Sequence, residues 1–206
     1  MQWQRRHALG LLARRCVLPD SPSGRPAVFI DRDGTIAEEM GYLNHASRFR
    51  IYPFAAEAIR RLNDAKLPVV VVTNQSGVGR GYFPESLVRT VHELMNKQLQ
   101  EKGARVDAIY YCPHTGSDQC TCRKPLPGLI ERAAREHRLD LQHSFVVGDR
   151  YGDVELARRA GSRGILVRTG YGEGEIQWHA AKWPASPDFI ADDLAGAVDW
   201  ILRQLK

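Results

Sequence analysis

The sequence of 206 residues predicts an α/β protein with a doubly wound, mainly parallel, Rossmann-like sheet. Short apolar runs rich in valine and isoleucine alternate along the chain with longer segments that carry apolar residues at helical spacing. Glycine, asparagine and aspartate follow directly after several of these runs, as they do where buried strands end. Because right-handed strand–helix–strand units place successive strands parallel, we expect one sheet with helices on both faces.

Two regions are predicted along the chain. A cluster of prolines, serines and glycine between Pro19 and Pro26 separates an arginine-rich extension from the first apolar run. We therefore predict a basic N-terminal extension and linker over 1–26, followed by a single domain over 27–206. The extension has few acidic residues, a composition that fits a transit peptide, a surface helix or an overlong start, and these alternatives stay open.

The first half of the domain is predicted to contain three strands, at 27–30, 68–72 and 106–111. The second of these is a continuous β-branched run, which is typical of a strand buried on both faces. Helices are predicted at 54–66 and 84–101, because each has apolar residues three and four positions apart. Proline near the first turn of the longer helix supports its start.

The second half repeats the alternation with shorter segments. Apolar spacing predicts helices at 127–137, 154–160 and 195–205, and β-branched runs predict strands at 145–147 and 165–167. No large insertion that could form a cap domain separates these segments. We therefore expect loops to surround the functional site, and these loops are 37–52, 76–84 and 112–126.

Composition excludes several classes of protein. The formal net charge is +5, but residues 1–26 contribute five arginines and one aspartate, so the remaining chain is nearly neutral. A nucleic-acid-binding domain carries its positive charge on the fold itself, so we expect no nucleic-acid partner. No window reaches the roughly 18 consecutive apolar residues of a membrane span, so we expect no membrane association. We expect the protein to be a monomer, because no amphipathic surface in the sequence implies a partner.

Acidic, basic and hydroxyl-bearing residues follow four of the predicted strands. Asp31 and Asp33 come after the first strand and Thr73 after the second, while Lys124 lies in the 112–126 loop and Asp149 follows the 145–147 strand. Clustered carboxylates need a cation such as Mg²⁺, whereas a hydroxyl and a lysine can neutralise phosphate oxygens. Taken together they indicate phosphoryl transfer, although each residue alone could be a turn or capping residue.

Asp153 has two possible roles in the sequence. It lies four residues after Asp149, where it could belong to the same acidic cluster. A position just before the predicted 154–160 helix would equally suit a capping carboxylate. We leave these two roles open.

The order of these motifs resembles that of haloacid dehalogenase-type phosphatases over residues 27–170. The resemblance implies an aspartyl-phosphate mechanism, with Asp31 as the nucleophile and Asp33 as the general acid and base. Mg²⁺ would be held by the Asp31 side chain, the Asp33 backbone carbonyl and Asp149. Thr73 and Lys124 would hold the transferring phosphoryl group.

A second constellation predicts a structural zinc site. Cys112, His114, Cys120 and Cys122 provide three thiolates and one imidazole, a complete tetrahedral set for Zn²⁺ with no open position. Clustered cysteines beside a histidine favour a metal site over a disulfide framework, so we expect a reducing, cytoplasmic location. Cys16 lies outside the set and is expected to be an ordinary thiol.

Within the superfamily, the zinc loop resembles that of bacterial D,D-heptose 1,7-bisphosphate phosphatases, which are related to histidinol-phosphate phosphatases. The shared segments are Gly41-Tyr42, Thr73 to Gly77, Tyr110 to His114 and Cys122 to Pro125. The resemblance implies hydrolysis of the C7 phosphate in the synthesis of surface-glycan precursors. Histidinol phosphate is the alternative substrate, and a non-catalytic zinc-loop binding module is the alternative outside the enzymes.

The same resemblance implies which residues bind the substrate. They are Glu39, Met40, Gly41, Tyr42, Thr73, Asn74, Gln75, Ser76, Arg123, Lys124 and Arg150, the last standing where the family usually has a lysine. Gly77, Gly79 and Gly81 hint at a dinucleotide-binding loop, but Tyr82 occupies the place of its third glycine. We therefore expect no nicotinamide cofactor.

Overall fold

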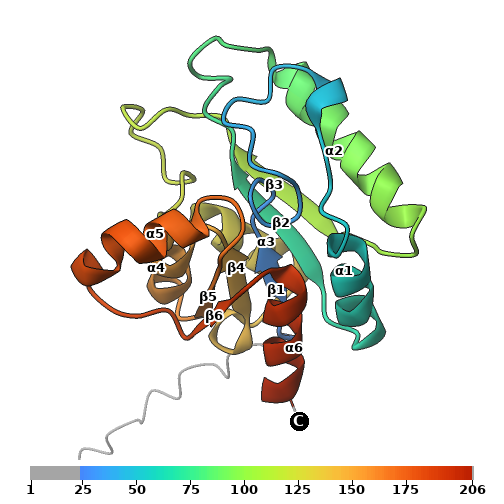
Figure 1. The fold of residues 1–206 in the computed structure, drawn as a ribbon, viewed down its shortest axis with the longest axis vertical. Helices are drawn as coiled ribbons and strands as arrows, with labels where there is room; N and C mark the ends of the chain where they lie inside the picture. The colour runs from blue at the N-terminus through green and yellow to red at the C-terminus, as the bar shows by residue number, and fades with distance from the viewer. Residues whose placement is uncertain (1–23, 206) are drawn as a thin grey trace, which may run out of the picture.

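The computed structural model describes residues 24–205, so most of the predicted 1–26 extension lies outside the described residues. Strands and helices alternate through this part of the chain (Figure 1). Their bounds are β1 (Val28–Ile30), α1 (Ala55–Asp64), β2 (Val69–Asn74), α2 (Glu85–Gln100), β3 (Ala108–Cys112), α3 (Gly128–His137), β4 (Phe145–Gly148), α4 (Tyr151–Arg159), β5 (Arg163–Val167), α5 (Gly172–His179), β6 (Phe189–Ala191) and α6 (Leu194–Gln204). Short 3₁₀ helices occupy Ala46–Arg48, Leu141–His143 and Ala180–Lys182.

The six strands form one fully parallel sheet in the order β3-β2-β1-β4-β5-β6, which confirms the predicted fold class. Strand β1 lies in the centre of the sheet, and from there the chain winds outward through β2 and β3 and then returns to the other side of β1. In β1, Ile30 pairs with Val71 of β2 and with Val147 of β4. The reversal between β1 and β4 is a topological switch point, where a parallel sheet leaves a crevice at its carboxyl edge.

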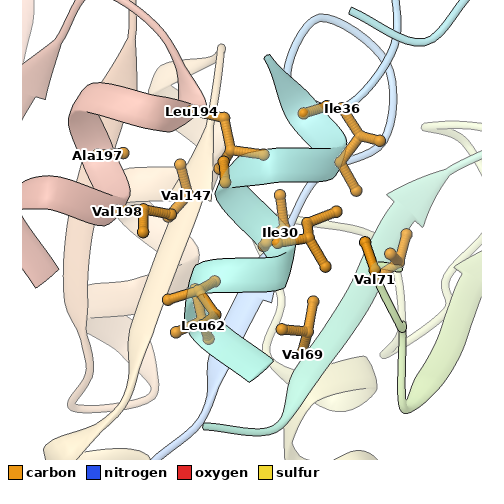
Figure 2. Packing of buried hydrophobic residues seen from close by; sticks show 14 of the residues in the cluster. Ile30, Ile36, Leu62, Val69, Val71, Val147, Leu194, Ala197 and Val198 are labelled. Atoms are coloured by element: carbon orange, nitrogen blue, oxygen red, sulfur yellow. The ribbon is translucent and has the colours of Figure 1, made fainter. Parts of the chain in front are cut away.

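Both faces of the sheet are covered by helices, because alternate residues of the central strands point to opposite sides. Val28 and Ile30 belong to a cluster that includes the buried faces of α1, α2 and α6. Figure 2 shows Ile30 in this cluster among Leu62 of α1, Val71 of β2 and Leu194 of α6. Phe29 belongs to the opposite cluster, which includes α3 and α4. The sheet is therefore a rigid base for the side chains at its edge.

Three features differ from the sequence prediction. Helix α4 begins at Tyr151 rather than at 154, because the Asp153 carboxylate accepts a hydrogen bond from the Arg150 backbone N–H and caps the first turn. Helix α5 was not predicted, since its side chains are largely exposed and form no apolar stripe. Strand β6 was not predicted because it is a short, partly buried strand at the edge of the sheet with a single β-branched residue.

The carboxyl edge of the sheet is covered by loops. No large domain is inserted between the strands anywhere in residues 24–205, in agreement with the predicted absence of a cap. The longest connections there are the segment between β1 and α1 and the segment between β3 and α3. Across the same residues, every helix is too short or too polar to cross a membrane.

Candidate active site

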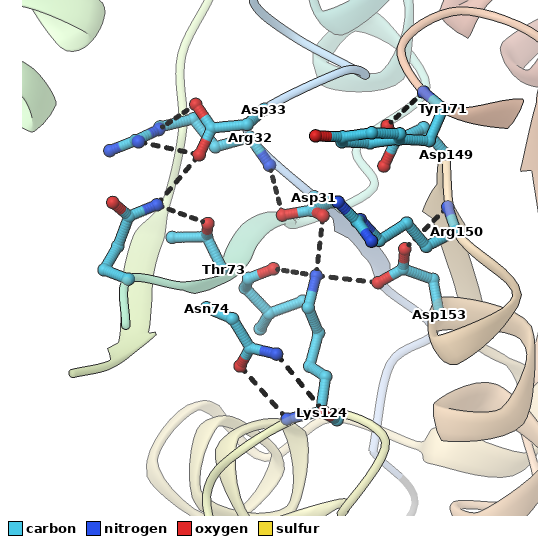
Figure 3. A network of polar contacts seen from close by, with 12 residues as sticks. Asp31, Arg32, Asp33, Thr73, Asn74, Lys124, Asp149, Arg150, Asp153 and Tyr171 are labelled. Atoms are coloured by element: carbon cyan, nitrogen blue, oxygen red, sulfur yellow. Dashed lines mark hydrogen bonds and ion pairs between the residues drawn. The ribbon is translucent and has the colours of Figure 1, made fainter. Parts of the chain in front are cut away.

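The carboxyl edge of the sheet brings together residues that are far apart in the sequence. Asp31 follows β1 directly, Thr73 lies near the end of β2, and Asp149 follows β4. Lys124 reaches the same place from the loop between β3 and α3, and Asp153 reaches it from the first turn of α4. Figure 3 shows these side chains around a common centre.

The Lys124 ammonium is the hub of this centre. Its Nζ donates to Asp31 Oδ2 at 2.8 Å, to Asp153 Oδ1 at 2.7 Å and to the Val72 carbonyl at 3.0 Å. All three N–H donors of the ammonium therefore have an acceptor. The Asn74 amide fixes the backbone of the same lysine, accepting from its N–H at 3.1 Å and donating to its carbonyl at 3.2 Å.

The centre carries more negative than positive charge. Asp31, Asp149 and Asp153 are buried, and each offers an oxygen within 4.8 Å of the others. Burial, opposed by the charge of Lys124, raises the pKa of Asp31 to about 7. Burial and the neighbouring carboxylates raise the pKa of Asp149 to about 8. Burial alone would lower the pKa of Lys124, but Asp153 and Asp31 hold that pKa above its ordinary value.

This donor set fits a magnesium ion. Mg²⁺ takes hard oxygen ligands and is bound through one or two carboxylates together with the oxygens of a phosphate substrate. Three buried carboxylates face one ammonium group, so a divalent cation would balance the remaining charge. Asp31, Asp149 and Asp153 each offer an oxygen to such an ion. The ligands that the family resemblance implies are the Asp31 and Asp149 side chains and the Asp33 backbone carbonyl.

Glycines make room for the Asp149 carboxylate. Its Oδ2 accepts a hydrogen bond from the backbone N–H of Tyr171 at 2.8 Å. Gly34 and Gly170 have φ angles of +78° and +59°, and a Cβ atom on either residue would overlap Asp149 Oδ2. Only glycine suits both the positive φ and the close approach.

Asp33 is held apart from the buried acids. Arg32 grips its carboxylate with two parallel bonds, Nε to Oδ1 at 3.0 Å and Nη2 to Oδ2 at 2.7 Å. Gln75 Nε2 donates to Asp33 Oδ2 at 2.8 Å and to Thr73 Oγ1 at 2.9 Å. In Figure 3 the Asp33 carboxylate is turned towards Arg32 and away from Asp31. The two acids of the first motif therefore have different surroundings.

The predicted zinc ligands lie together in the loop after β3. Cys112 Sγ lies 3.2 Å from Cys122 Sγ and 3.8 Å from Cys120 Sγ, while His114 Nδ1 lies 3.2 Å from Cys122 Sγ. These separations exceed the disulfide bond length of about 2.05 Å. Zn–S bonds of about 2.3 Å in a tetrahedron place sulfurs roughly 3.8 Å apart, so the four residues fit a zinc ion.

The zinc loop leads directly into the active centre. Arg123 follows the last cysteine, and its Nη1 donates to the His114 carbonyl at 3.1 Å. Lys124 is the next residue. The positions of Arg123 and Lys124 therefore depend on how well the four-ligand cluster is ordered.

A cavity of about 510 Å³ opens above the buried acids, a volume within the range of small-molecule sites, about 300–1,000 Å³. Asp31, Asp153 and Lys124 line it together with Arg123 and Arg150. The cavity therefore combines buried carboxylates with three cationic side chains.

Most of the predicted substrate residues line this cavity. They are Glu39, Gly41, Tyr42, Thr73, Asn74, Gln75, Ser76, Arg123, Lys124 and Arg150. Met40 is placed differently, because its side chain packs against the hydrophobic core. Glu39 Oε1 accepts from the Gly41 N–H at 2.5 Å, which holds the first loop in a tight turn. The Asn74 amide is occupied by the Lys124 backbone, so its contacts orient the lysine.

The cavity also contains residues that the motifs did not indicate. Arg80, Tyr171 and Glu175 line it, and the Arg150 guanidinium lies 3.7 Å from the centroid of the Tyr171 ring. Tyr171 and Glu175 come from the region of α5, which the sequence did not predict. In the sequence, Tyr171 directly follows Thr169 and Gly170. A tyrosine after a glycine is too common a pattern to indicate a binding site.

Comparisons with known proteins agree with this arrangement. A family model described as HAD-hydrolase-like matches residues 121–197. The D-glycero-D-manno-heptose-1,7-bisphosphate 7-phosphatase of Thermosynechococcus vestitus is 42% identical over 196 residues, which cover 88% of this chain and 97% of that protein. The D-glycero-beta-D-manno-heptose-1,7-bisphosphate 7-phosphatase of Yersinia pestis is 39% identical over 170 residues, 77% of this chain and 88% of that protein.

Solved structures have the same fold. The D,D-heptose 1,7-bisphosphate phosphatase from Bordetella bronchiseptica, crystallised with magnesium and phosphate, superposes with a TM-score of 0.80 at 34% identity. The alignment covers 87% of this chain and 99% of that one. A putative HAD-like phosphatase from Mesorhizobium loti has a TM-score of 0.74 at 34% identity, covering 89% and 88% of the two chains.

Proposed function

Because the chain belongs to the haloacid dehalogenase-like phosphatases, and within them to the D-glycero-D-manno-heptose-1,7-bisphosphate 7-phosphatases, we propose that it hydrolyses the C7 phosphate of this sugar bisphosphate. The observation that carries the proposal is the position of Lys124 between Asp31 and Asp153, in a cavity that is also lined by three arginines. This arrangement suits a small substrate with two phosphates. Release of the C7 phosphate would serve the synthesis of surface-glycan precursors.

Asp31 is the proposed nucleophile. Its Oδ1 accepts the Arg32 backbone N–H at 2.7 Å and its Oδ2 accepts Lys124 Nζ at 2.8 Å, so the carboxylate is fixed at the bottom of the cavity. Attack by one carboxylate oxygen on phosphorus would form an aspartyl-phosphate and release the sugar alkoxide. Lys124 and Thr73 would hold the phosphoryl oxygens during the transfer.

Asp33 is the proposed general acid and base. It lines the cavity, and its side chain is 21% exposed, so it can reach an oxygen that enters from solvent. It would protonate the leaving sugar oxygen in the first step and accept a proton from the attacking water in the second. Its separation from Asp31 allows one carboxylate to bond to phosphorus while the other carries the proton.

The proposed cofactors have different tasks. Mg²⁺, held by Asp31, the Asp33 carbonyl and Asp149, would neutralise charge on the phosphoryl oxygens. Zn²⁺, held by Cys112, His114, Cys120 and Cys122, would order the loop that carries Arg123 and Lys124.

The distal phosphate of the substrate is proposed to bind the arginines of the cavity. Arg123 and Arg150 line it together with Arg80. The fork of a guanidinium matches the oxygens of a phosphate group. Glu39, Gly41 and Tyr42 would contact the sugar hydroxyl groups between the two phosphates.

The remaining predictions concern the whole chain. We propose that residues 27–206 form the phosphatase domain and that it acts as a cytoplasmic monomer without a nucleic-acid partner. The clustering of Cys112, Cys120 and Cys122 around His114 supports a reducing location, because it suits a metal site rather than a disulfide framework.

Phosphate release from a substrate panel tests the proposed function. The panel consists of the α and β anomers of the heptose bisphosphate, fructose 1,6-bisphosphate and histidinol phosphate, each with Mg²⁺. We expect the highest kcat/KM on a heptose bisphosphate, with the 1-phosphate retained in the product. Asp31→Asn is the matched control, because it keeps the shape of the side chain and should reduce turnover by about 10³-fold or more. Higher efficiency on histidinol phosphate would contradict the substrate, and release from no substrate would favour a binding module.

A further inference from the structure

His92 is a buried titratable residue that the proposed reaction does not use. It lies on the inner face of α2, spaced with Val88, Val91, Met95 and Leu99, where a helix normally presents apolar residues to the core. Its side chain is 7% exposed. A polar ring at such a position needs a specific partner to offset the loss of hydration.

That partner is Arg32. Nη1 of Arg32 lies 3.1 Å from Nε2 of His92, and the His92 and Tyr111 rings form an edge-to-face pair with centroids 5.6 Å apart. A guanidinium only donates hydrogen bonds, so His92 Nε2 must be the acceptor. The ring is therefore neutral, with its proton on Nδ1. In agreement, burial and the charge of Arg32 lower the pKa of His92 to about 3.

Arg32 connects His92 to Asp33. The arginine is 1% exposed, and its remaining fork, Nε and Nη2, makes the two parallel bonds to the Asp33 carboxylate. The face of the guanidinium lies 5.9 Å from the centroid of the Phe49 ring. Because a bidentate pair is planar, the orientation of the guanidinium dictates the orientation of the carboxylate.

Among the contacts of this guanidinium, His92 is the one that fixes its outer nitrogen. Without an acceptor there, a buried N–H of Arg32 would have no hydrogen-bond partner. The free-energy cost of that N–H would favour rotation of the guanidinium towards other acceptors. Any such rotation would turn the Asp33 carboxylate with it. The acceptor on α2 therefore acts on the acid of the first motif through one intermediate residue.

We propose that His92 is a positioning residue for proton transfer, because by accepting from Arg32 it holds the guanidinium in the plane that presents Asp33 to the leaving oxygen. The inference rests on the proposed function, in which Asp33 carries the proton. It concerns a residue outside the four motifs, and His92 itself touches neither the substrate nor Asp33.

Leaving-group dependence tests this role. A sugar alkoxide needs a proton as it departs, whereas p-nitrophenolate departs readily without one. We expect His92→Leu, which fills the space without an acceptor, to lower kcat/KM about tenfold or more on the heptose bisphosphate and less than about threefold on p-nitrophenyl phosphate. The quantity kcat/KM reports the step in which the leaving group departs, and it excludes the later hydrolysis of the aspartyl-phosphate, which is common to both substrates. His92→Gln can still accept from Arg32 and should recover most of the loss on the sugar substrate.

The ratio of the two kcat/KM values separates positioning from folding. Partial unfolding lowers both rates equally and leaves the ratio unchanged. His143→Leu is the matched control, because His143 precedes β4 at the opposite edge of the sheet and is exposed. Equal losses on both substrates, no loss on either, or failure of His92→Gln to restore the ratio would overturn the inference. Absence of heptose bisphosphate turnover by the unaltered protein would instead overturn the proposed function.

Discussion

Asp153 accepts from Lys124 and from the start of its own helix with its two carboxylate oxygens. Oδ1 receives Lys124 Nζ at 2.7 Å, and Oδ2 receives the Arg150 backbone N–H at 3.2 Å. One side chain thus caps α4 and holds the buried ammonium. The two roles that the sequence left open for this residue are therefore both present in the structure.

The double contact predicts the effect of Asp153→Asn. The amide keeps a carbonyl oxygen for the helix cap but loses the charge beside Lys124, whose pKa the carboxylate holds up. We expect kcat to fall about tenfold or more, with a loss of stability of about 1–3 kcal/mol because one partner of a buried charge is removed. Phosphate release and thermal unfolding measure the two effects.

Asp193→Asn is the matched control, since Asp193 caps α6 through the Gly196 N–H and is remote from Lys124. It should leave kcat unchanged. Unaltered kcat in Asp153→Asn would show that Asp153 is only a cap.

Two glycines with nearly equal φ angles predict different effects of the same substitution. Gly34 has a φ of +78° and Gly161 a φ of +73°. A Cβ on Gly34 would overlap Asp149 Oδ2, whereas nothing lies within 4 Å of a Cβ on Gly161. Both Gly→Ala variants incur the conformational cost of a positive φ, about 1 kcal/mol, but only Gly34→Ala displaces a predicted magnesium ligand.

We expect Gly34→Ala to weaken Mg²⁺ activation about tenfold or more, because displacing a metal carboxylate disrupts the coordination sphere. Gly161→Ala should lose stability without a change in the Mg²⁺ concentration for half-maximal activity. Titration of phosphate release with Mg²⁺ measures this difference. Equal Mg²⁺ requirements in both variants would contradict the assignment of Asp149.

The strand and helix order could be predicted because it depends on local patterns. The valine run of β2 and the apolar stripe of α2 each identify an element without knowledge of its neighbours. Helix α5 and strand β6 lack such patterns, since their place is set by contacts with the rest of the fold. Gly152 concealed the start of α4, because a glycine in the first turn resembles the end of a loop.

The active-site residues divide in the same way. Asp31 and Lys124 belong to motifs that follow one another along the chain in the order typical of this superfamily. Their proximity at the carboxyl edge of the sheet could therefore be predicted. His92 stands in no motif, and its only signal was a polar residue at an apolar position of α2. Met40 was placed at the substrate by its neighbours in the motif, although its apolar side chain favours the core.

The raised pKa values of the buried acids predict how stability depends on pH without metal. The pKa of Asp31 rises to about 7 and that of Asp149 to about 8, from an ordinary value of 3.8. At pH values between the ordinary and the raised pKa values, the folded protein binds more protons than the unfolded chain. The free energy of unfolding therefore falls as pH rises. We expect the chelated protein to unfold at a lower temperature at pH 8.5 than at pH 5.5, as measured by thermal scans.

Asp149→Asn should reduce this slope, since an amide does not titrate. Added Mg²⁺ should stabilise the unaltered protein most at the higher pH, because a cation replaces the protons that the carboxylates have lost. Stability that rises with pH in the chelated protein would contradict the electrostatic account.

The zinc cluster predicts that a loop substitution affects catalysis from outside the cavity. Cys120 is neither a lining residue of the cavity nor a neighbour of Lys124 in the sequence, but it completes the four-ligand set that precedes Arg123. Cys120→Ser should lose the metal and release the loop, because the site holds together only with deprotonated ligands around a cation. Elemental analysis should find about one equivalent of zinc in the unaltered protein and much less in the variant.

Loss of the metal should lower the unfolding temperature and raise KM for the bisphosphate, since Arg123 donates to the carbonyl of His114, itself a predicted ligand. Cys16→Ser, outside the ligand set, is the control and should retain both zinc and KM. Full stability and unchanged KM in Cys120→Ser would mean that the loop is ordered by its own hydrogen bonds and that the four side chains meet without a metal.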